Sequence, residues 1–110
     1  MILDSDLTQD DFLGGRLHLR QPAKGYRAGI DAVFLAASLT AQADDKVLEL
    51  GAGTGAVMCC VLHRKPDLRL TGVERNATYA ALARDNLKAN RLTADVITAD
   101  FTAKIFKENA

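Results

Sequence analysis

"VLELGAGTG", residues 47–55, is the stretch from which the fold of this sequence can be predicted. A short apolar run, typical of a buried parallel strand, leads directly into three glycines at positions 51, 53 and 55. The buried-helix pattern "GAVMCCVLHR" follows and ends at Pro66. A strand, a glycine-rich turn and a helix in this order are typical of sheets that bind a ligand at the carboxyl ends of their strands.

Strands and helices alternate from Lys46 onward. Strands are predicted over 46–50, 68–74 and 95–100, and the two helices between them over 55–64 and after an Asn76 cap. Right-handed crossovers then produce a parallel sheet in strand order 3-2-1. The sequence therefore predicts an α/β fold with part of a doubly wound, Rossmann-like sheet.

The residues before Lys46 follow different patterns. Gly14-Gly15 forms a turn signal, and residues 16–20 alternate between polar and apolar, which predicts a β-hairpin. Residues 29–39 are apolar on nearly all sides, which predicts a buried helix. We expect an N-terminal unit, 1–45, that packs its hairpin and helix on an incomplete ligand-binding half-domain, 46–110.

The first strand of this sheet lacks a neighbour on one side. It is central in a complete doubly wound sheet, yet only "FTAKIFKENA" follows the third strand. Exposed edges of parallel sheets are usually covered. We therefore expect that the chain is a fragment of a longer enzyme, or that its own hairpin or a second copy in a homodimer covers the edge.

Composition excludes several classes of protein. A length of 110 residues suits one domain, and 14 Lys and Arg balance 14 Asp and Glu, so overall charge does not indicate a nucleic-acid partner. The acidic start is not a signal peptide, no window is long enough to span a membrane, and a cytoplasmic location is expected. Cys59 and Cys60 are adjacent, which disfavours a disulfide and provides no metal site, so we interpret them as reduced core residues.

The glycine turn itself has two phosphate-binding interpretations. A P-loop requires Lys and Ser or Thr after its last glycine, and the apolar residues after Gly55 exclude it. A dinucleotide fingerprint is compatible with Gly51, Gly53 and Ala56, with Glu74 in place to bind a ribose. An NAD-binding domain therefore remains an alternative.

Charge favours a different ligand. Glu49 lies two residues before the first glycine, where a carboxylate repels a pyrophosphate but suits the ammonium and sulfonium groups of S-adenosylmethionine (SAM). The glycines let the backbone approach such a ligand closely. Glu74 can accept from both ribose hydroxyls, and Asp100, at the end of the third strand, from the adenine amino group.

These residues resemble a known family. "VLELGAGTG", Glu74 and Asp100 resemble the SAM-binding series of class I methyltransferases. "FLGGRLHLRQPAKGYRAGIDAVFLAA", residues 12–37, is similar to the region that precedes this series in bacterial tRNA adenine-N6 methyltransferases that act on a valine tRNA. Together the two similarities cover residues 12–101.

The resemblance assigns roles to individual residues. It implies that Glu49 and the glycine loop hold the methionine end, that Glu74 holds the ribose and that Asp100 holds the adenine. Loop residues in this assignment are Gly51, Ala52, Gly53 and Gly55. Tyr26, Arg27 and Asp31 are expected to line the same pocket.

The sequence departs from that family in one respect. Adenine-N6 methyltransferases carry an Asn/Asp-Pro-Pro-Tyr/Phe motif that contacts the target amino group, whereas the only prolines here are Pro22 and Pro66. The resemblance then implies a cofactor-binding fragment that contains no catalytic residue. We expect it to bind SAM weakly without transferring methyl groups.

Structural interpretations of the same residues remain open. The glycines can form an ordinary turn, Glu74 and Asp100 can be solvated strand ends, and Glu49 can pair with a lysine. The basic residues around Tyr26 suit either contact with the backbone of an RNA such as tRNA or a solvated hairpin face; they are Arg16, Arg20, Lys24 and Arg27. A nonenzymatic association module is the second alternative function.

Overall fold

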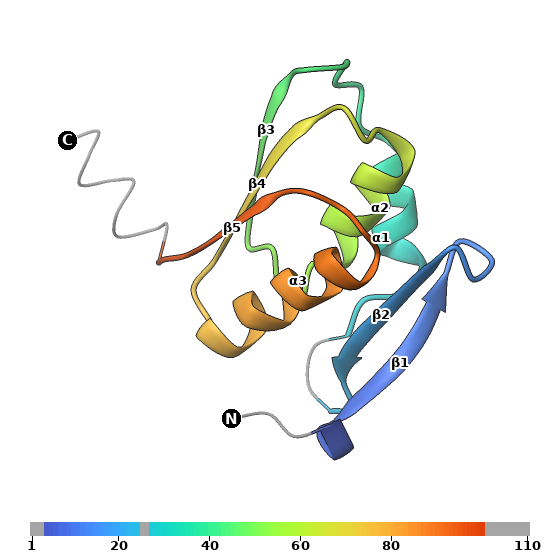
Figure 1. Ribbon diagram of the computed structural model, residues 1–110, viewed down its shortest axis with the longest axis vertical. Coiled ribbons are helices and arrows are strands. Elements are labelled where there is room, and N and C mark those ends of the chain that lie inside the picture. The colour runs from blue at the N-terminus through green and yellow to red at the C-terminus, as the bar shows by residue number, and fades with distance from the viewer. Residues whose placement is uncertain (1–3, 25–26, 101–110) are drawn as a thin grey trace.

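The computed structural model describes residues 4–24 and 27–100 (Figure 1). A short 3₁₀ helix, η1, precedes two antiparallel strands, and three helices then alternate with three further strands. In chain order the elements are η1 (Asp4–Asp6), β1 (Leu7–Phe12), β2 (Leu17–Pro22), α1 (Ile30–Ala37), β3 (Lys46–Leu50), α2 (Ala56–Arg64), β4 (Arg69–Glu74), α3 (Ala77–Ala89) and β5 (Asp95–Thr98).

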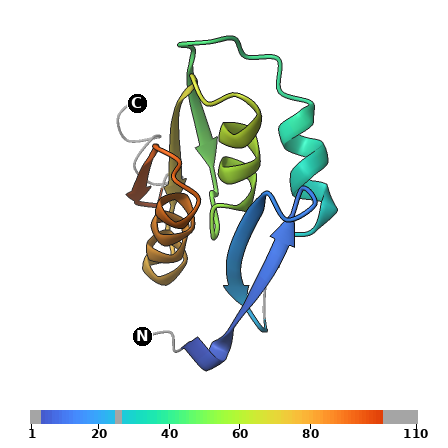
Figure 2. The ribbon, with the colours of Figure 1, turned by 45° about the vertical axis from the view of Figure 1, so that its right-hand side comes forward.

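The three later strands form a parallel sheet in the order β3-β4-β5, which confirms the predicted order 3-2-1. Helices α2 and α3 cover one face of this sheet, and α1 lies outside α2 (Figure 2). The Asn76 side chain accepts from the N–H of Tyr79 and caps α3, as expected from the sequence. The α/β class and the crossovers of the fold are therefore those that the hydrophobic pattern indicates.

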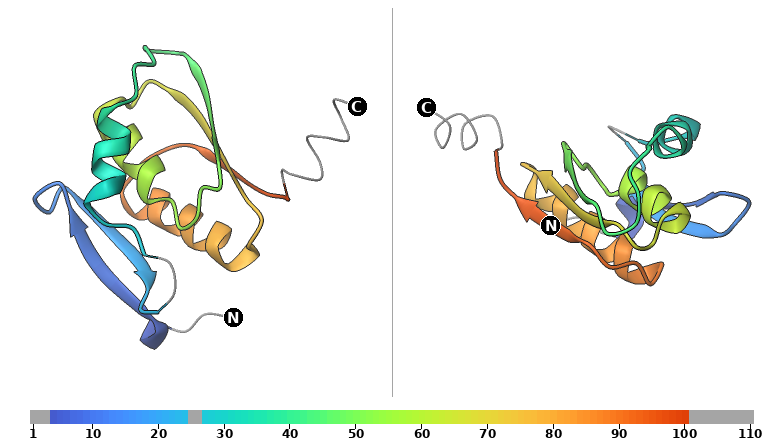
Figure 3. Two further views of the ribbon diagram at one scale, coloured as in Figure 1. Left: turned by 180° about the vertical axis from the view of Figure 1, so that it is seen from behind. Right: turned by 90° about the horizontal axis from the view of Figure 1, so that it is seen from above.

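The opposite face of the sheet carries exposed apolar side chains. Leu48, Leu50 and Ile97 are 55%, 46% and 48% exposed. The helices of the described ranges lie on the other side of the sheet (Figure 3). The hairpin of β1 and β2 is a separate sheet that packs against α2 and α3. The expectation that the hairpin covers the edge of β3 is therefore wrong, because the same strands are held on the helical side of the molecule.

The hairpin itself turns at Gly14 and Gly15, which have φ of +65° and +85°. Leu17, Leu19 and Gln21 of β2 are almost fully buried, so the alternation in the sequence correctly predicts its inner face. The partner strand β1 lies within the acidic start, where the sequence shows no strand pattern.

Helix α1 differs from the prediction of a buried helix. Ile30, Phe34 and Leu35 are 69%, 65% and 59% exposed, whereas Ala32 and Ala36 are buried. The helix is the outermost layer and contacts α2 through its small residues. An apolar composition on all sides does not determine which sides receive a neighbour, and this explains the error.

The core lies between the sheet, α2 and α3, and it includes both cysteines as free thiols. Burial raises the pKa of Cys59 to about 12 and that of Cys60 to about 11, so both thiols stay protonated and unreactive at neutral pH. In the part of the chain that is described, three or more potential metal ligands do not cluster, and no helix is long and apolar enough to cross a membrane.

Candidate functional site

The loop between β3 and α2 owes its shape to its glycines. Gly51, Gly53 and Gly55 have φ of +76°, +58° and +88°, in the left-handed region that side chains disfavour. A Cβ at Gly51 would meet no atom within 4 Å, whereas a Cβ at Gly55 would lie 3.1 Å from Cα of Ala83. Gly51 therefore faces open space, and Gly55 allows the close packing of the loop on α3.

Strand β4 fixes the start of this loop through its backbone. The carbonyl oxygen of Val73 accepts from the N–H groups of Gly51 and Ala52 at 2.8 and 3.0 Å. The loop closes on itself where the N–H of Gly55 donates to the carbonyl of Ala52 at 3.0 Å. The backbone of the loop is thus preorganised at the carboxyl ends of β3 and β4.

Glu74, at the end of β4, holds the next part of the loop. Its Oε1 accepts from the N–H of Gly53, and its Oε2 accepts from the N–H of Asn76, both at 2.8 Å. The residue is 8% exposed, so these bonds compensate a nearly buried carboxylate. Each carboxylate oxygen has a second acceptor position, which leaves Glu74 capacity for hydroxyl donors.

Asp100 follows β5 at the same end of the sheet. The N–H of Ala99 donates to the carbonyl of Glu74 at 3.1 Å, which holds the end of β5 beside the end of β4. Asp100, the next residue, is exposed. The structure therefore brings Glu74, Asp100 and the glycine loop to one edge, as expected for strands that run parallel.

Glu49 carries the unsatisfied polar atom of the site. Its Oε1 is buried and has no hydrogen-bond partner among the described residues, and desolvation raises the pKa of the carboxyl group to about 7. It lines a cavity of about 350 Å³ between the end of α1, β3 and α2, whose walls include Leu39 and Val57. The ion pair between Glu49 and a lysine that the sequence left open is absent from the described structure.

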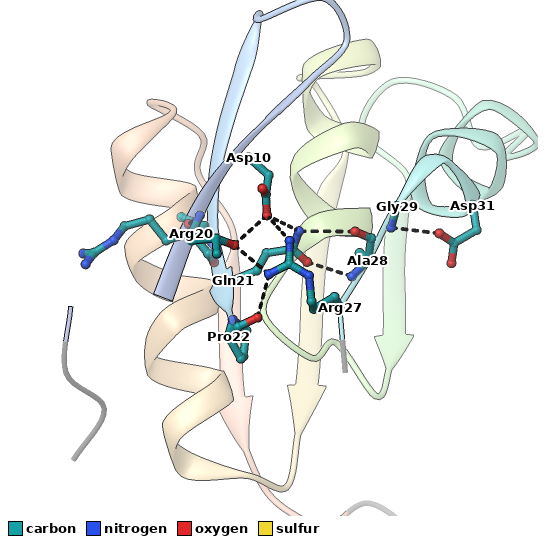
Figure 4. Close-up of polar contacts among 10 residues, drawn as sticks. Asp10, Arg20, Gln21, Pro22, Arg27, Ala28, Gly29 and Asp31 are labelled. Carbon is teal, nitrogen blue, oxygen red and sulfur yellow. Dashed lines mark hydrogen bonds and ion pairs between the residues drawn. The ribbon is translucent and has the colours of Figure 1, made fainter. Parts of the chain in front are cut away.

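The side chain of Arg27, which follows the hairpin in the chain, is hydrogen-bonded to the hairpin (Figure 4). Its Nη1 donates to Thr8 Oγ1 at 2.7 Å and to the carbonyl of Pro22 at 2.8 Å, and its Nη2 pairs with Asp10 Oδ2 at 2.9 Å. Gln21, which is buried, also donates to Asp10 Oδ2 at 3.0 Å. The guanidinium thus ties the segment before α1 to β1 and β2, and these partners lie outside the glycine loop.

Asp31 and Tyr26 complete the predicted residues. Asp31 is exposed in the first turn of α1, and its Oδ1 accepts from the N–H of Gly29 at 2.9 Å (Figure 4). Tyr26 lies outside the described residues. Of the predicted set, the structure brings together the loop glycines, Ala52, Glu74 and Asp100, with Glu49 on the preceding strand.

Sequence reasoning missed Asn86. This residue of α3 is 1% exposed, and its Nδ2 donates to the carbonyl of Thr54, within the glycine loop, at 2.9 Å. Two asparagines four residues apart, Asn86 and Asn90, in a helical segment were the available signal, because asparagine is a poor helix former. A long-range contact for such a residue cannot be identified from the local pattern alone.

Comparisons with known proteins place the site in context. The model of the methyltransferase small domain family matches residues 27–110. The ribosomal RNA small subunit methyltransferase C of Erwinia tasmaniensis is 30% identical over 105 residues, which cover 93% of this chain and 31% of that protein. A tRNA1(Val) (adenine(37)-N6)-methyltransferase of a Flavobacteriaceae bacterium is 32% identical over 68 residues, which cover 62% of this chain and 29% of that protein.

Solved structures share the fold. The M. jannaschii TYW2 structure in complex with AdoMet aligns with a TM-score of 0.75 and 19% identity over 93% of this chain and 47% of that one. The chain spans less than a third of either curated relative, at 31% and 29% of their lengths.

Proposed function

This chain belongs to the methyltransferase small domain family, and on that premise we propose that it forms the cofactor-binding part of a SAM-dependent RNA methyltransferase. We propose adenine N6 in tRNA as the acceptor, since one relative bears the name of a tRNA1(Val) (adenine(37)-N6)-methyltransferase. The resemblance of residues 12–37 to the same type of enzyme favours tRNA, although the relative named for ribosomal RNA also aligns over 93% of this chain, so both RNAs should be assayed side by side.

The observation that carries the proposal is the charge around the glycine loop. Glu49, with its buried unpartnered oxygen, and Glu74, with two free acceptor positions, lie on the strands that flank the loop. A pyrophosphate would meet the Glu74 carboxylate there and a Glu49 whose pKa of about 7 leaves it partly ionised at neutral pH, and within the described residues no lysine pairs with Glu49. A ligand that carries an ammonium group and a sulfonium suits these acids.

Each residue of the site has a role in holding this ligand. The open space at Gly51 lets the backbone approach the methionine end, and Glu49 faces its positive charge. Glu74 accepts from the ribose hydroxyls, and Asp100 accepts from the adenine amino group. When bound, SAM supplies an electrophilic methyl group, and the residues of this chain bind and orient it.

Binding of the methyl acceptor would require a motif that contacts the target base. An Asn/Asp-Pro-Pro-Tyr/Phe motif is absent from the 110 residues. We therefore propose that the chain by itself binds SAM and does not transfer the methyl group. Incubation with tritiated SAM and unmodified tRNA tests this, and methyl incorporation above a chain-free control would overturn it.

RNA contact is proposed for the hairpin. Arg16 and Lys24 are exposed, and the side chain of Arg20 extends away from the Arg27 network (Figure 4). Arg27 is engaged with Asp10, so the proposal no longer depends on it. Replacing Arg16 and Lys24 by alanine should weaken tRNA binding and reduce its salt dependence by about one charge per residue. Unchanged anisotropy of labelled tRNA would reject this surface.

A second copy of the chain is proposed to cover the outer edge of β3. In the described structure this edge pairs with no strand, and Leu48 beside it is exposed. Sedimentation velocity over a wide concentration range should show a dimer that Leu48→Lys dissociates. A monomer at every concentration would reject the dimer.

Calorimetric titration tests the cofactor. We expect saturable binding of SAM and of its demethylated product S-adenosylhomocysteine (SAH), and none of NAD. Preference for NAD would replace the proposed ligand by a dinucleotide. If none of the three ligands, SAM, SAH and NAD, produces a heat of binding, a nonenzymatic association module would be favoured.

A further inference from the structure

Asn86 of α3 and Asn90, the residue that caps the C-terminus of this helix, complete the free edge of β2. Asn86 Oδ1 accepts from the N–H of Arg20 at 2.8 Å, and its Nδ2 donates to the carbonyl of the same residue at 3.0 Å. Asn90 repeats the pattern on His18, with both contacts at 2.9 Å. Each side-chain amide therefore replaces one residue of a neighbouring strand.

Helix and strand spacing make this match possible. Four residues of an α-helix rise about 6 Å, and two residues of a strand advance about 6.6 Å. Asn86 and Asn90 are four apart, and Arg20 and His18 are two apart, so both pairs meet in register. The partners of each amide also determine its orientation, since the N–H needs an acceptor and the carbonyl needs a donor.

Asn86 has a third partner that Asn90 lacks. Its Nδ2 also donates to the carbonyl of Thr54 at 2.9 Å, in the middle of the glycine loop. The corresponding extra bond of Asn90 runs from its Nδ2 to the carbonyl of Asn86, at 2.7 Å, at the C-terminal end of α3. Both asparagines thus dock the hairpin, and only Asn86 touches the loop.

Asn86, which touches the loop, is also the more deeply buried of the two asparagines. Asn86 is 1% exposed, while Asn90 is partly exposed at the end of α3. A buried amide with three satisfied hydrogen bonds holds a single orientation, because each broken bond leaves an unpaired polar group. The Thr54 carbonyl is therefore held from the side of α3, while Glu74 holds the N–H of Gly53 from β4.

We propose that Asn86 is a positioning residue for the cofactor: its amide fixes the Thr54 carbonyl and couples the hairpin edge to the glycine loop. The inference rests on the proposed function for its ligand, SAM, but its structural part concerns the loop alone. Asn90 provides a matched control, since it makes the same hairpin contacts without reaching the loop.

The test compares Asn86→Ala with Asn90→Ala in the full chain. Both variants lose hairpin contacts, and both should lower the urea midpoint. At a temperature where each is folded, Asn86→Ala should bind SAH about tenfold or more weakly, because the loop is displaced. Asn90→Ala should stay within about twofold of the unaltered chain. Equal losses in the two variants would reduce Asn86 to a structural residue and overturn the proposal.

Amide NMR of the free variants separates this inference from the proposed function. Asn86→Ala should shift the N–H resonances of Gly53 and Gly55, and Asn90→Ala should not. If the unaltered chain fails to bind SAH, the proposed function fails, and these shifts alone decide whether Asn86 positions the loop.

One measurement needs no variant and covers the case in which Asn86→Ala does not fold. The side-chain amide resonances of Asn86 in the unaltered chain should shift as SAH saturates the site, and those of Asn90 should stay in place. Equal response or no response of the Asn86 amide during demonstrated binding would overturn the coupling.

Discussion

The carboxylate of Glu74 accepts a hydrogen bond from the N–H of Gly53 at 2.8 Å, so the end of one strand holds the loop that follows its neighbour. The two residues are 21 positions apart in the sequence; Glu74 ends β4, and Gly53 lies in the loop that follows the adjacent parallel strand β3. A side chain that shapes the loop also keeps acceptor capacity for a ligand. We therefore predict that loop geometry and ligand binding depend on the same carboxylate.

Replacement of Glu74 by glutamine should impair both roles. The glutamine amide nitrogen cannot accept, so the N–H of either Gly53 or Asn76 loses its partner. We expect the free energy of unfolding to fall by about 1–3 kcal/mol and SAM binding to weaken by about tenfold or more. Urea denaturation and calorimetry measure the two effects. Asp85→Asn, at an exposed acid of α3, is the control, and an equally small effect at both positions would contradict the role of Glu74.

Two glycines of the loop should respond differently to alanine. Gly51→Ala places its Cβ in open space. It should lower the free energy of unfolding by only about 1 kcal/mol, because alanine disfavours the left-handed backbone conformation at this position. Gly55→Ala adds a contact of 3.1 Å with Ala83 and should destabilise the fold further. SAM affinity should fall in Gly51→Ala despite its nearly normal stability. If Gly51→Ala binds SAM as well as the unaltered chain, the ligand does not approach the loop there.

Much of the fold is predictable because its signals lie in short stretches of sequence. Residues 46–50 match the observed strand β3, and the Asn76 cap is where the sequence places it, since both signals depend on near neighbours. The hairpin was predicted from its turn and from β2, but the bounds of β1 were not, because its acidic residues hide the alternation. The exposure of Phe34 was also missed, because it depends on which helix face finds a neighbour.

The candidate site likewise has one part that the sequence pattern predicts and one part that it does not. The proximity of Glu74 to the glycines could be predicted because parallel strands bring their carboxyl ends together. The contact between Arg27 and Asp10, 17 residues away, and the contact between Asn86 and Arg20, at a separation of 66 residues, were not predicted. Contacts of that range depend on how the hairpin packs, which no short pattern encodes.

Glu49 should make stability depend on pH. Its pKa is raised from 4.5 to about 7 in the folded chain, so between these values the folded state retains a proton that the unfolded state has released. The free energy of unfolding should therefore decrease as pH rises through this window, by up to roughly 3 kcal/mol, and level off above it. The difference between the unaltered chain and Glu49→Gln, from urea curves at pH 4 to 8, isolates this group. A difference that is constant with pH would contradict the buried state of Glu49.

Gly72 tests the packing of α2 on the sheet. A Cβ at this position of β4 would lie 2.5 Å from Met58 Sδ and 2.9 Å from Ala52 Cβ. Gly72→Ala should therefore reduce the free energy of unfolding by about 1–3 kcal/mol, as overpacking does. Gly14→Ala is the control, because a Cβ there would meet nothing within 4 Å. It should lower the free energy of unfolding only by the cost of placing alanine in the left-handed backbone conformation. Comparable losses in the two variants would show that Met58 moves aside.

Amide NMR with SAM and NAD added in parallel tests the central claim, that carboxylates around the glycine turn select a cationic nucleoside, most directly. SAM should produce saturable shifts at Gly51, Gly53 and Gly55 together with residues 74 and 100, and NAD should leave these resonances in place. Saturable shifts of the same amides with NAD, or SAM-induced shifts confined to residues remote from the loop, would contradict the account.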